Sequence, residues 1–144
     1  MSGHIFFNLD YYGFDDALYS SVKLVELLDK QAEKLSDIVD KFPKVFNTPE
    51  IRVECDDLKK FDIISKVIAN QKTKNQKVID IDGIRVSSEN GWWLLRASNT
   101  QAELVLRCEA NSFENLKKEL SLVKEAIFEV DSELSDKILV ENYV

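Results

Sequence analysis

The sequence predicts an α+β fold, a two-layer domain with a mostly antiparallel four- to five-stranded sheet and two helices on one face, preceded by a helical appendage. Two hairpin signals, Asp82-Gly83 and Asn90-Gly91, each lie between short strand-forming runs, and such pairs tolerate the positive φ of tight turns. Apolar residues recur at helical spacing on both sides of these runs. Pro43 and Pro49 enclose a linker, because the residue before a proline avoids helical geometry. We therefore expect a domain boundary within residues 43–49.

The appendage, residues 1–45, is predicted to contain one strand and two helices. The short apolar run Ile5-Phe6-Phe7 is typical of a strand. Asp15 is expected to cap the next helix, and Ser36 a second, shorter one. The first helix, within residues 14–31, is indicated by apolar residues at helical spacing, namely Leu18, Val22, Val25 and Leu28.

The second part, residues 46–131, contains the expected sheet. Helix 57–71 is predicted to present Phe61, Ile64 and Ile68 on one face. The predicted strands span residues 50–54, 76–81, 84–88, 91–96 and 103–109. A final helix carries an apolar stripe of Phe113, Leu116, Leu120, Val123 and Ile127. Residues 132–144 are acidic with an apolar end, and we set them apart as a tail without an assigned role.

Composition excludes several classes of function. The chain has 144 residues, 44% of them hydrophobic, and a net charge of −7, which argues against a nucleic-acid partner or an anionic membrane surface because both need a basic face. No apolar run approaches the roughly 20 residues of a membrane helix, and no signal peptide is visible. With one histidine and two distant cysteines, Cys55 and Cys108, a zinc site is not expected. Reduced thiols and a cytoplasmic location are expected instead.

The candidate binding site is the segment that ends the 91–96 strand. Arg96 can place two parallel hydrogen bonds on a phosphate. Ser98, Asn99 and Thr100 add short donors, and their backbone N–H groups can form an anion-holding nest. The same residues also suit an ordinary polar turn between two strands. From the residues alone both interpretations stay open.

For the other prominent tryptophans, arginines and lysines, we expect structural roles. Trp92 and Trp93 are neighbours on a strand and should point to opposite faces, one of them into the core. Arg85 and Arg107 are expected to form ion pairs with nearby acids. Lys59 and Lys60 begin a helix and are expected to be solvated.

Several motifs, in order along the chain, resemble the C-terminal part of the α-D-phosphohexomutases, in particular the bacterial phosphomannomutase/phosphoglucomutase branch. Near the start, Met1-Ser2-Gly3-His4 resembles the end of that family's sugar-recognition loop, Gly-Glu-Met-Ser-Gly-His. The remaining matches are Tyr12-Gly13-Phe14-Asp15-Asp16-Ala17-Leu18-Tyr19, Thr48-Pro49-Glu50-Ile51-Arg52-Val53, Asp82-Gly83-Ile84-Arg85-Val86, Gly91-Trp92-Trp93-Leu94-Leu95-Arg96-Ala97-Ser98-Asn99-Thr100 and Leu104-Val105-Leu106-Arg107-Cys108-Glu109-Ala110. The matches cover residues 1 to about 130.

The resemblance implies a C-terminal fragment of a phosphohexomutase, with a TATA-binding-protein-like last domain preceded by the end of the third, sugar-binding domain. Arg96, Ser98, Asn99 and Thr100 would hold the substrate phosphate that is not reacting, and Ser2 and His4 would belong weakly to sugar binding. Relatives usually continue the phosphate loop with Thr-Thr-Pro where this chain has Thr100-Gln101-Ala102. Losing the proline is expected to loosen the loop, because proline fixes φ.

Catalysis is expected to lie outside this sequence. The family's Ser-His-Asn-Pro phosphoserine setting and its Mg²⁺-binding Asp-Gly-Asp-x-Asp-Arg loop do not occur here. The parent would be an isomerase that moves phosphate between C1 and C6 of a hexose, and this part would supply substrate grip and closure. The alternative is a non-catalytic product of a split or eroded gene, acting as a phosphosugar-binding or protein-interaction module. In either case the expected partners are a phosphosugar, the other mutase domains or, through residues 14–31, a second copy of the chain.

Overall fold

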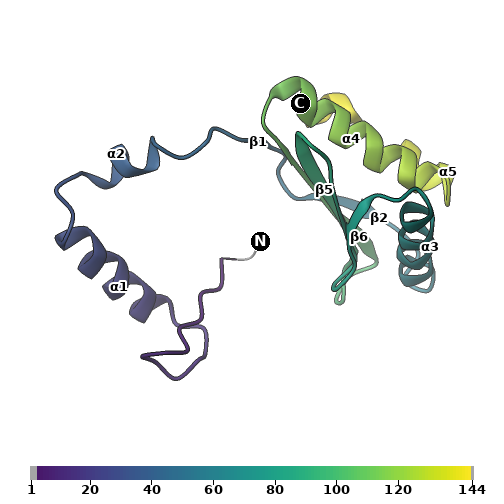
Figure 1. Cartoon of the computed structure of the whole chain (residues 1–144). Helices are drawn as coiled ribbons and strands as arrows, with labels where there is room; N and C mark the ends of the chain where they lie inside the picture. Colours follow the sequence, from purple (N-terminus) through teal and green to yellow (C-terminus); the bar gives the residue numbers. More distant parts are fainter. Residues whose placement is uncertain (1–2, 144) are drawn as a thin grey trace. The chain divides into compact units, whose positions relative to one another are not determined.

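The computed structural model describes residues 3–143 and divides into two compact units, with the division between Pro43 and Lys44 (Figure 1). The division falls at the start of the predicted linker. Each unit is described below by itself.

The N-terminal unit consists of two helices and irregular segments. Helix α1 spans Ala17–Asp29, and α2 spans Leu35–Val39. The predicted strand at Ile5-Phe6-Phe7 is wrong, since Phe6 makes only one isolated bridge, to Asp15. The predicted caps are wrong as well. Asp16, one residue later than expected, accepts the Tyr19 N–H at 2.9 Å, while α2 begins before Ser36, which lies inside it.

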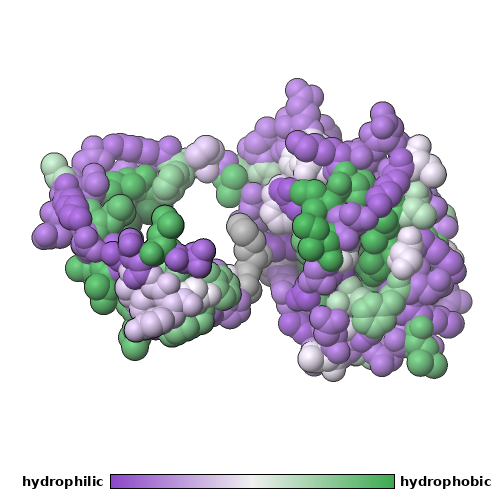
Figure 2. Space-filling model, turned by 60° about the horizontal axis from the view of Figure 1, so that its bottom comes forward, coloured by the Kyte–Doolittle hydropathy of each residue, from purple (hydrophilic) through white to green (hydrophobic). Residues whose placement is uncertain are grey.

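No residue between 3 and 43 is buried. The apolar stripe of α1 faces solvent, with Leu18 82%, Val22 64% and Val25 66% exposed. Aromatic side chains from the segment that precedes α1 cluster with Tyr19 of the helix, and Tyr11 stacks on Tyr19 with ring centroids 3.9 Å apart. Figure 2 shows apolar (green) side chains on the surface of this unit, at the left of the view. This unit therefore has secondary structure without a hydrophobic core of its own.

The C-terminal unit is built on an antiparallel sheet in the order β1-β6-β5-β4-β3, with β2 also paired to β6. Both β1 and β2 lie along the same edge of β6, at Glu109–Ala110 and Glu103–Leu106 respectively. The sheet is thus five strands wide, as predicted, although it contains six strands. Their bounds are β1 Phe46–Asn47, β2 Ile51–Glu54, β3 Lys77–Ile79, β4 Ile84–Ser87, β5 Gly91–Ala97 and β6 Glu103–Ala110.

Two long helices, α3 (Lys60–Thr73) and α4 (Phe113–Phe128), cover one face of the sheet (Figure 1). The strand residues that point to this face are buried, among them Trp93, Leu95 and Leu106, each 2% exposed or less. The stripe of α4 packs on them as predicted, except that Phe113 is 41% exposed. On α3 the prediction is partly wrong: Ile64 is buried, but Phe61 is exposed, and Ile63 and Val67 take its place in the core.

The segment that the sequence sets apart as a tail packs into this core. Helix α5 spans Ser132–Asp136 and is followed by the short 3₁₀ helix η1, Val140–Asn142. Leu134 and Ile138 are buried within the same apolar cluster as the sheet. The Ser135 hydroxyl donates to the Lys124 carbonyl of α4 at 3.0 Å, which fixes α5 against that helix.

Glycines permit both hairpin turns, for different reasons. Gly83 has a φ of +83°, the left-handed region that favours glycine. Gly91 has no positive φ, contrary to the prediction for Asn90-Gly91. It is needed for close approach instead, since a Cβ there would lie 2.5 Å from the Glu109 carbonyl oxygen of β6.

Candidate phosphate-binding site

The predicted binding residues lie at the end of β5 and in the loop of residues 98–102 that leads to β6. Arg96 is the last residue of β5 but one and points away from the helices, because its neighbours Leu95 and Ala97 are buried in the core. Asn99 and Thr100 are exposed at the tip of the loop, whereas Ser98 is only 7% exposed. The structure thus brings an arginine and a polar loop together at one end of the sheet.

Ser98 organises this loop from inside. Its Oγ accepts the N–H of Gln101 at 3.2 Å and, less closely, the N–H of Thr100 at 3.4 Å. The expected nest of the Ser98, Asn99 and Thr100 N–H groups is therefore largely occupied, since the Thr100 N–H points to this hydroxyl and the Ser98 N–H donates to the Glu103 carbonyl at 3.0 Å. A hydroxyl that accepts twice keeps its own proton. Ser98 can accordingly donate one hydrogen bond to an anion.

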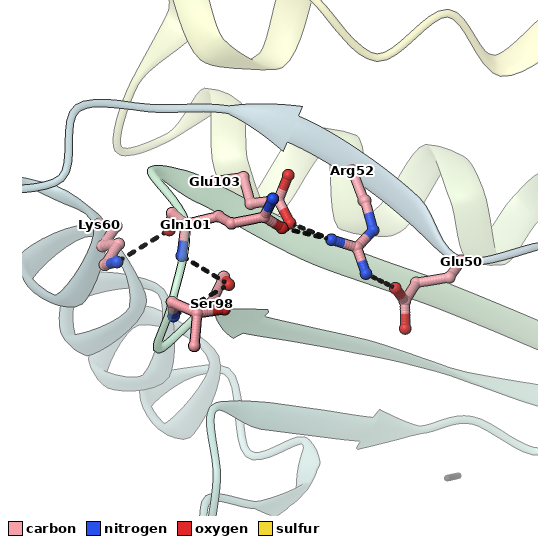
Figure 3. Close-up of polar contacts among 7 residues, drawn as sticks. Glu50, Arg52, Lys60, Ser98, Gln101 and Glu103 are labelled. Atoms are coloured by element: carbon pink, nitrogen blue, oxygen red, sulfur yellow. Dashed lines mark hydrogen bonds and ion pairs between the residues drawn. The ribbon is translucent and has the colours of Figure 1, made fainter.

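Gln101 is held from two sides by cations of other elements (Figure 3). From α3, the Lys60 ammonium donates to the Gln101 main-chain carbonyl at 2.9 Å. From β2, Arg52 donates to the Gln101 side-chain oxygen at 2.8 Å. These contacts restrain the loop at Gln101, within the segment that the sequence analysis expects to be looser.

Lys60 is the residue that sequence reasoning missed. The prediction of a solvated side chain is wrong, because Lys60 is 3% exposed and also pairs with Asp57 at 2.5 Å. The prediction is right for Lys59, which is exposed. A lysine at the first position of a helix gave no signal that it reaches a loop 41 residues later.

Arg52 is fixed in turn by two carboxylates. Glu50 pairs with it at 2.6 Å, and Glu103 at the start of β6 pairs with its other nitrogen. The hydrogen bond to Glu50 and then the charge of Glu103 raise the pKa of the Arg52 guanidinium. The positive charge of Arg52 is thus balanced by two carboxylates, and its role is to hold Gln101. Arg96 remains as the cation beside the loop that has no carboxylate partner among the described side chains.

The turn at Gly83 supports β5 beneath Arg96. A Cβ at Gly83 would lie 2.4 Å from the Leu95 carbonyl oxygen and 2.6 Å from the Arg96 Cβ. Only a glycine fits this approach. The backbone that carries Arg96 is therefore wedged between its neighbouring strands.

Arg85 and Arg107 do not form the expected ion pairs, since none of the carboxylates whose side chains the structure describes lies within 4.0 Å of either. Arg85 donates to the Ser87 hydroxyl at 3.3 Å and lies over the Trp92 ring at 4.7 Å. The Nε of Arg107 is buried and has no hydrogen-bond partner among the described residues. The predicted split of the tryptophans is correct, with Trp93 in the core and Trp92 on the opposite face.

The weaker sugar-binding prediction falls on the N-terminal unit. Ser2 lies outside the described residues. His4 is exposed, and its Nδ1 contacts the Asp15 carboxylate, which also accepts the Ile5 N–H at 3.2 Å. The contact with His4 is the main cause of a lowered pKa for Asp15. Asp15 therefore holds the segment of His4 instead of capping α1.

Neither thiol forms a disulfide: Cys55 is partly buried, and Cys108 is buried. Burial and, less strongly, the charge of Glu119 raise the pKa of the Cys108 thiol. Among the side chains that the structure describes, no group of three or more His, Cys, Asp or Glu is arranged to hold a metal ion. Within residues 3–143, no helix combines the length and apolar character needed to span a bilayer.

Comparison with known proteins gives a consistent result. A family model described as "Phosphoglucomutase/phosphomannomutase, C-terminal domain" matches residues 50–128, and one described as "Phosphoglucomutase/phosphomannomutase, alpha/beta/alpha domain III" matches residues 1–46. A phosphomannomutase/phosphoglucomutase of Pseudomonas syringae pv. tomato is 42% identical over 118 residues, which are 82% of this chain and 25% of the relative. That of Pseudomonas putida is 40% identical over 134 residues, covering 93% of this chain and 29% of the relative.

A solved structure agrees with these matches. A phosphoglucomutase/phosphomannomutase family protein from Burkholderia thailandensis superposes with a TM-score of 0.76 at 35% identity, covering 90% of this chain and 27% of that one. The chain thus spans between a quarter and a third of the length of these relatives.

Proposed function

The chain belongs to the phosphoglucomutase/phosphomannomutase family, and from this premise we propose that it is the phosphate-gripping part of a phosphohexomutase. The parent enzyme would interconvert hexose 1-phosphate and hexose 6-phosphate. In this division residues 1–45 are the end of the third domain, and residues 46–131, with the segment of α5 packed into their core, form the domain that holds the non-reacting phosphate and closes over the substrate.

The observation that carries the proposal is the geometry around Arg96. An arginine without a carboxylate partner among the described side chains is the last residue but one of β5, close to a loop with exposed Asn99 and Thr100. The Ser98 hydroxyl keeps a free proton, because its oxygen accepts two loop N–H groups. A guanidinium with short polar donors suits a phosphate, which accepts several charge-assisted hydrogen bonds. In the whole enzyme such a loop on a mobile domain can release and regrip a substrate that turns over.

An NMR titration tests this proposal. The chain is titrated with glucose 1-phosphate, mannose 6-phosphate and inorganic phosphate, and we expect shifts at residues 96–101 with dissociation constants of about 1 mM, or about 4 kcal/mol. The variant Arg96→Ala should lose these shifts. Lys66→Ala, which removes a cation from the outer side of α3, should keep them. Absence of any shift in the wild-type chain at several millimolar ligand would refute the grip.

Metal and location follow from the same proposal. A magnesium ion in the parent would be held outside this chain and would neutralise charge on the moving phosphoryl group. Cys55 and Cys108, both without a disulfide, fit the reducing cytoplasm in which we place the enzyme.

The exposed stripe of α1 is proposed as a contact surface, either for another mutase domain or for a second copy of the chain. Leu18, Val22 and Val25 are each more than 60% exposed, and such apolar patches mark interaction sites. Light scattering over a range of concentrations should show self-association that Val22→Glu abolishes. A monomer at every concentration would restrict the surface to contacts within the parent enzyme.

A further inference from the structure

We propose that a pocket between α3, α4 and the strands β4 and β5 binds a small organic cation, an ammonium group on a short apolar body. The pocket has a volume of about 190 Å³. It lies on the covered side of the sheet, because its wall from β5 is the buried Trp93, whereas Arg96 points to the opposite face. The pocket is therefore separate from the phosphate loop.

The carboxylate of Glu119, on α4, is the charged group of this pocket. Glu119 lines the pocket and is only 3% exposed. Its Oε1 accepts the Ser88 hydroxyl, while its Oε2 is buried and has no hydrogen-bond partner among the described residues. A buried carboxylate with one hydrogen bond and no cation is costly in free energy. A cation in the pocket would supply the partner that Glu119 lacks.

The chain does not provide this cation from the wall of the pocket. Lys74 is the basic residue of the wall, and its ammonium is already paired with Glu129 at 2.6 Å. The exposed Glu125 adds a second carboxylate. The pocket is thus negatively charged, which favours a cation and disfavours a phosphosugar. A metal ion is a poorer occupant, since the described side chains give no group of three acidic, His or Cys ligands.

The rest of the wall suits an organic cation. Gln71 is 5% exposed, and its side-chain amide makes no hydrogen bond to any described residue, so its oxygen can accept an N–H of the ligand. Trp93 and Leu122 add apolar walls, and an indole ring also attracts cations over its face. Because a cavity of about 150 Å³ holds benzene, this pocket has room for roughly six to eight non-hydrogen atoms.

The test compares two ligands of the same shape, isobutylammonium and isobutanol, which differ in charge. Each is titrated into the 144-residue chain and followed by NMR. We expect saturable shifts at Ser88, Trp93 and Glu119, and about tenfold tighter binding of the ammonium than of the alcohol, because only the ammonium forms a charge-assisted hydrogen bond with the carboxylate. Residues 96–101 should not respond.

Variants on α4 identify the carboxylate. Glu119→Gln keeps the shape of the side chain and removes its charge, so the advantage of the ammonium over the alcohol should disappear. Glu119→Asp keeps the charge and should retain more of the advantage, with an amide spectrum that shows the same fold. Glu114→Gln, the matched control, removes an exposed carboxylate from the first turn of the same helix, outside the pocket, and should change nothing.

Three results would overturn the cation site. One is equal affinity of the wild-type chain for the two ligands, and another is an advantage that survives Glu119→Gln. The third is the absence of saturable shifts around the pocket, which would mean that it holds water only. None of them bears on the phosphate grip, which is measured with phosphate ligands at the other face of β5.

Discussion

Helices α1 and α4 show how differently the two units of this chain use similar sequence signals. Both helices have a side-chain N-cap, Asp16 for α1 and Ser112 for α4, and both carry an apolar stripe at helical spacing. The stripe of α4 is buried against the sheet, whereas no residue of α1 is buried. Local signals therefore specify where a helix forms, and a facing apolar surface decides whether it belongs to a stable core.

Shortening one stripe residue in each helix gives the largest expected effect. Leu120→Ala in α4 removes a side chain that is 0% exposed and should destabilise the C-terminal unit by about 2–5 kcal/mol, because it leaves a cavity in the core. Leu18→Ala in α1 changes a side chain that is 82% exposed and should alter stability by less than about 0.5 kcal/mol. Urea unfolding followed by tryptophan fluorescence measures the effect of each variant on the stability of the C-terminal unit, since Trp93 is in its core. Equal losses would show that α1 has a packing partner within the chain.

Removing the Lys60 side chain tests whether its contact with Gln101 keeps the loop of residues 98–102 ordered. Lys60→Ala deletes the donor to the Gln101 carbonyl and the partner of Asp57. We expect a loss of about 1.5–3 kcal/mol, as for a hydrogen bond from a charged group. Hydrogen exchange at Thr100 and Gln101 should become faster.

The neighbouring Lys59 is the matched control. It is exposed, so Lys59→Ala should leave both stability and loop exchange unchanged. If Lys60→Ala behaves in the same way, the loop is ordered by Ser98 and Arg52 without the lysine.

Much of the C-terminal unit could be predicted from the sequence because its signals are local. The Asp82-Gly83 turn, the alternation in β2 and the stripe of α4 each depend on residues a few positions apart, and the structure confirms them. Arg96 and its polar loop could be placed for the same reason. What could not be predicted depends on tertiary approach.

Lys60 and Arg52 illustrate such approach, because they meet Gln101 from residues 41 and 49 positions away. Arg85 and Arg107 were expected to find acids, since the chain is rich in them. Strand register decides which charged side chains meet across a sheet. The register cannot be read from the composition of the chain. In the N-terminal unit, Asp15 and Asp16 are adjacent candidates for one cap, and the contact with His4 decides between them.

The smallest expected effect, a pH dependence, separates the two caps. The Tyr11 hydroxyl donates to Asp16 at 2.5 Å and is the main cause of a lowered pKa for this carboxyl, with the Tyr19 N–H second. The same hydrogen bond raises the pKa of Tyr11 to about 12. Because the pKa of Asp16 is lower in the folded unit, its ionised form stabilises α1 above the ordinary value near 3.8, and this contribution is lost as pH falls through the folded pKa. Ser112 does not titrate, so the cap of α4 is unaffected over this range.

Backbone chemical shifts recorded from pH 6 to pH 2 measure the helicity of α1 and α4 in one sample. We expect α1 to lose helicity below about pH 4 while α4 keeps its own until the C-terminal unit unfolds as a whole. Asp16→Ser supplies a neutral cap of the kind that α4 uses, and it should remove the pH dependence of α1. If α1 still melts in that variant, its acid sensitivity comes from the exposed pairs of Glu26 with Lys23 and Lys30 instead of from the cap. The outcome thus decides whether a helix without a core depends on one hydrogen-bonded carboxylate or on its surface charges.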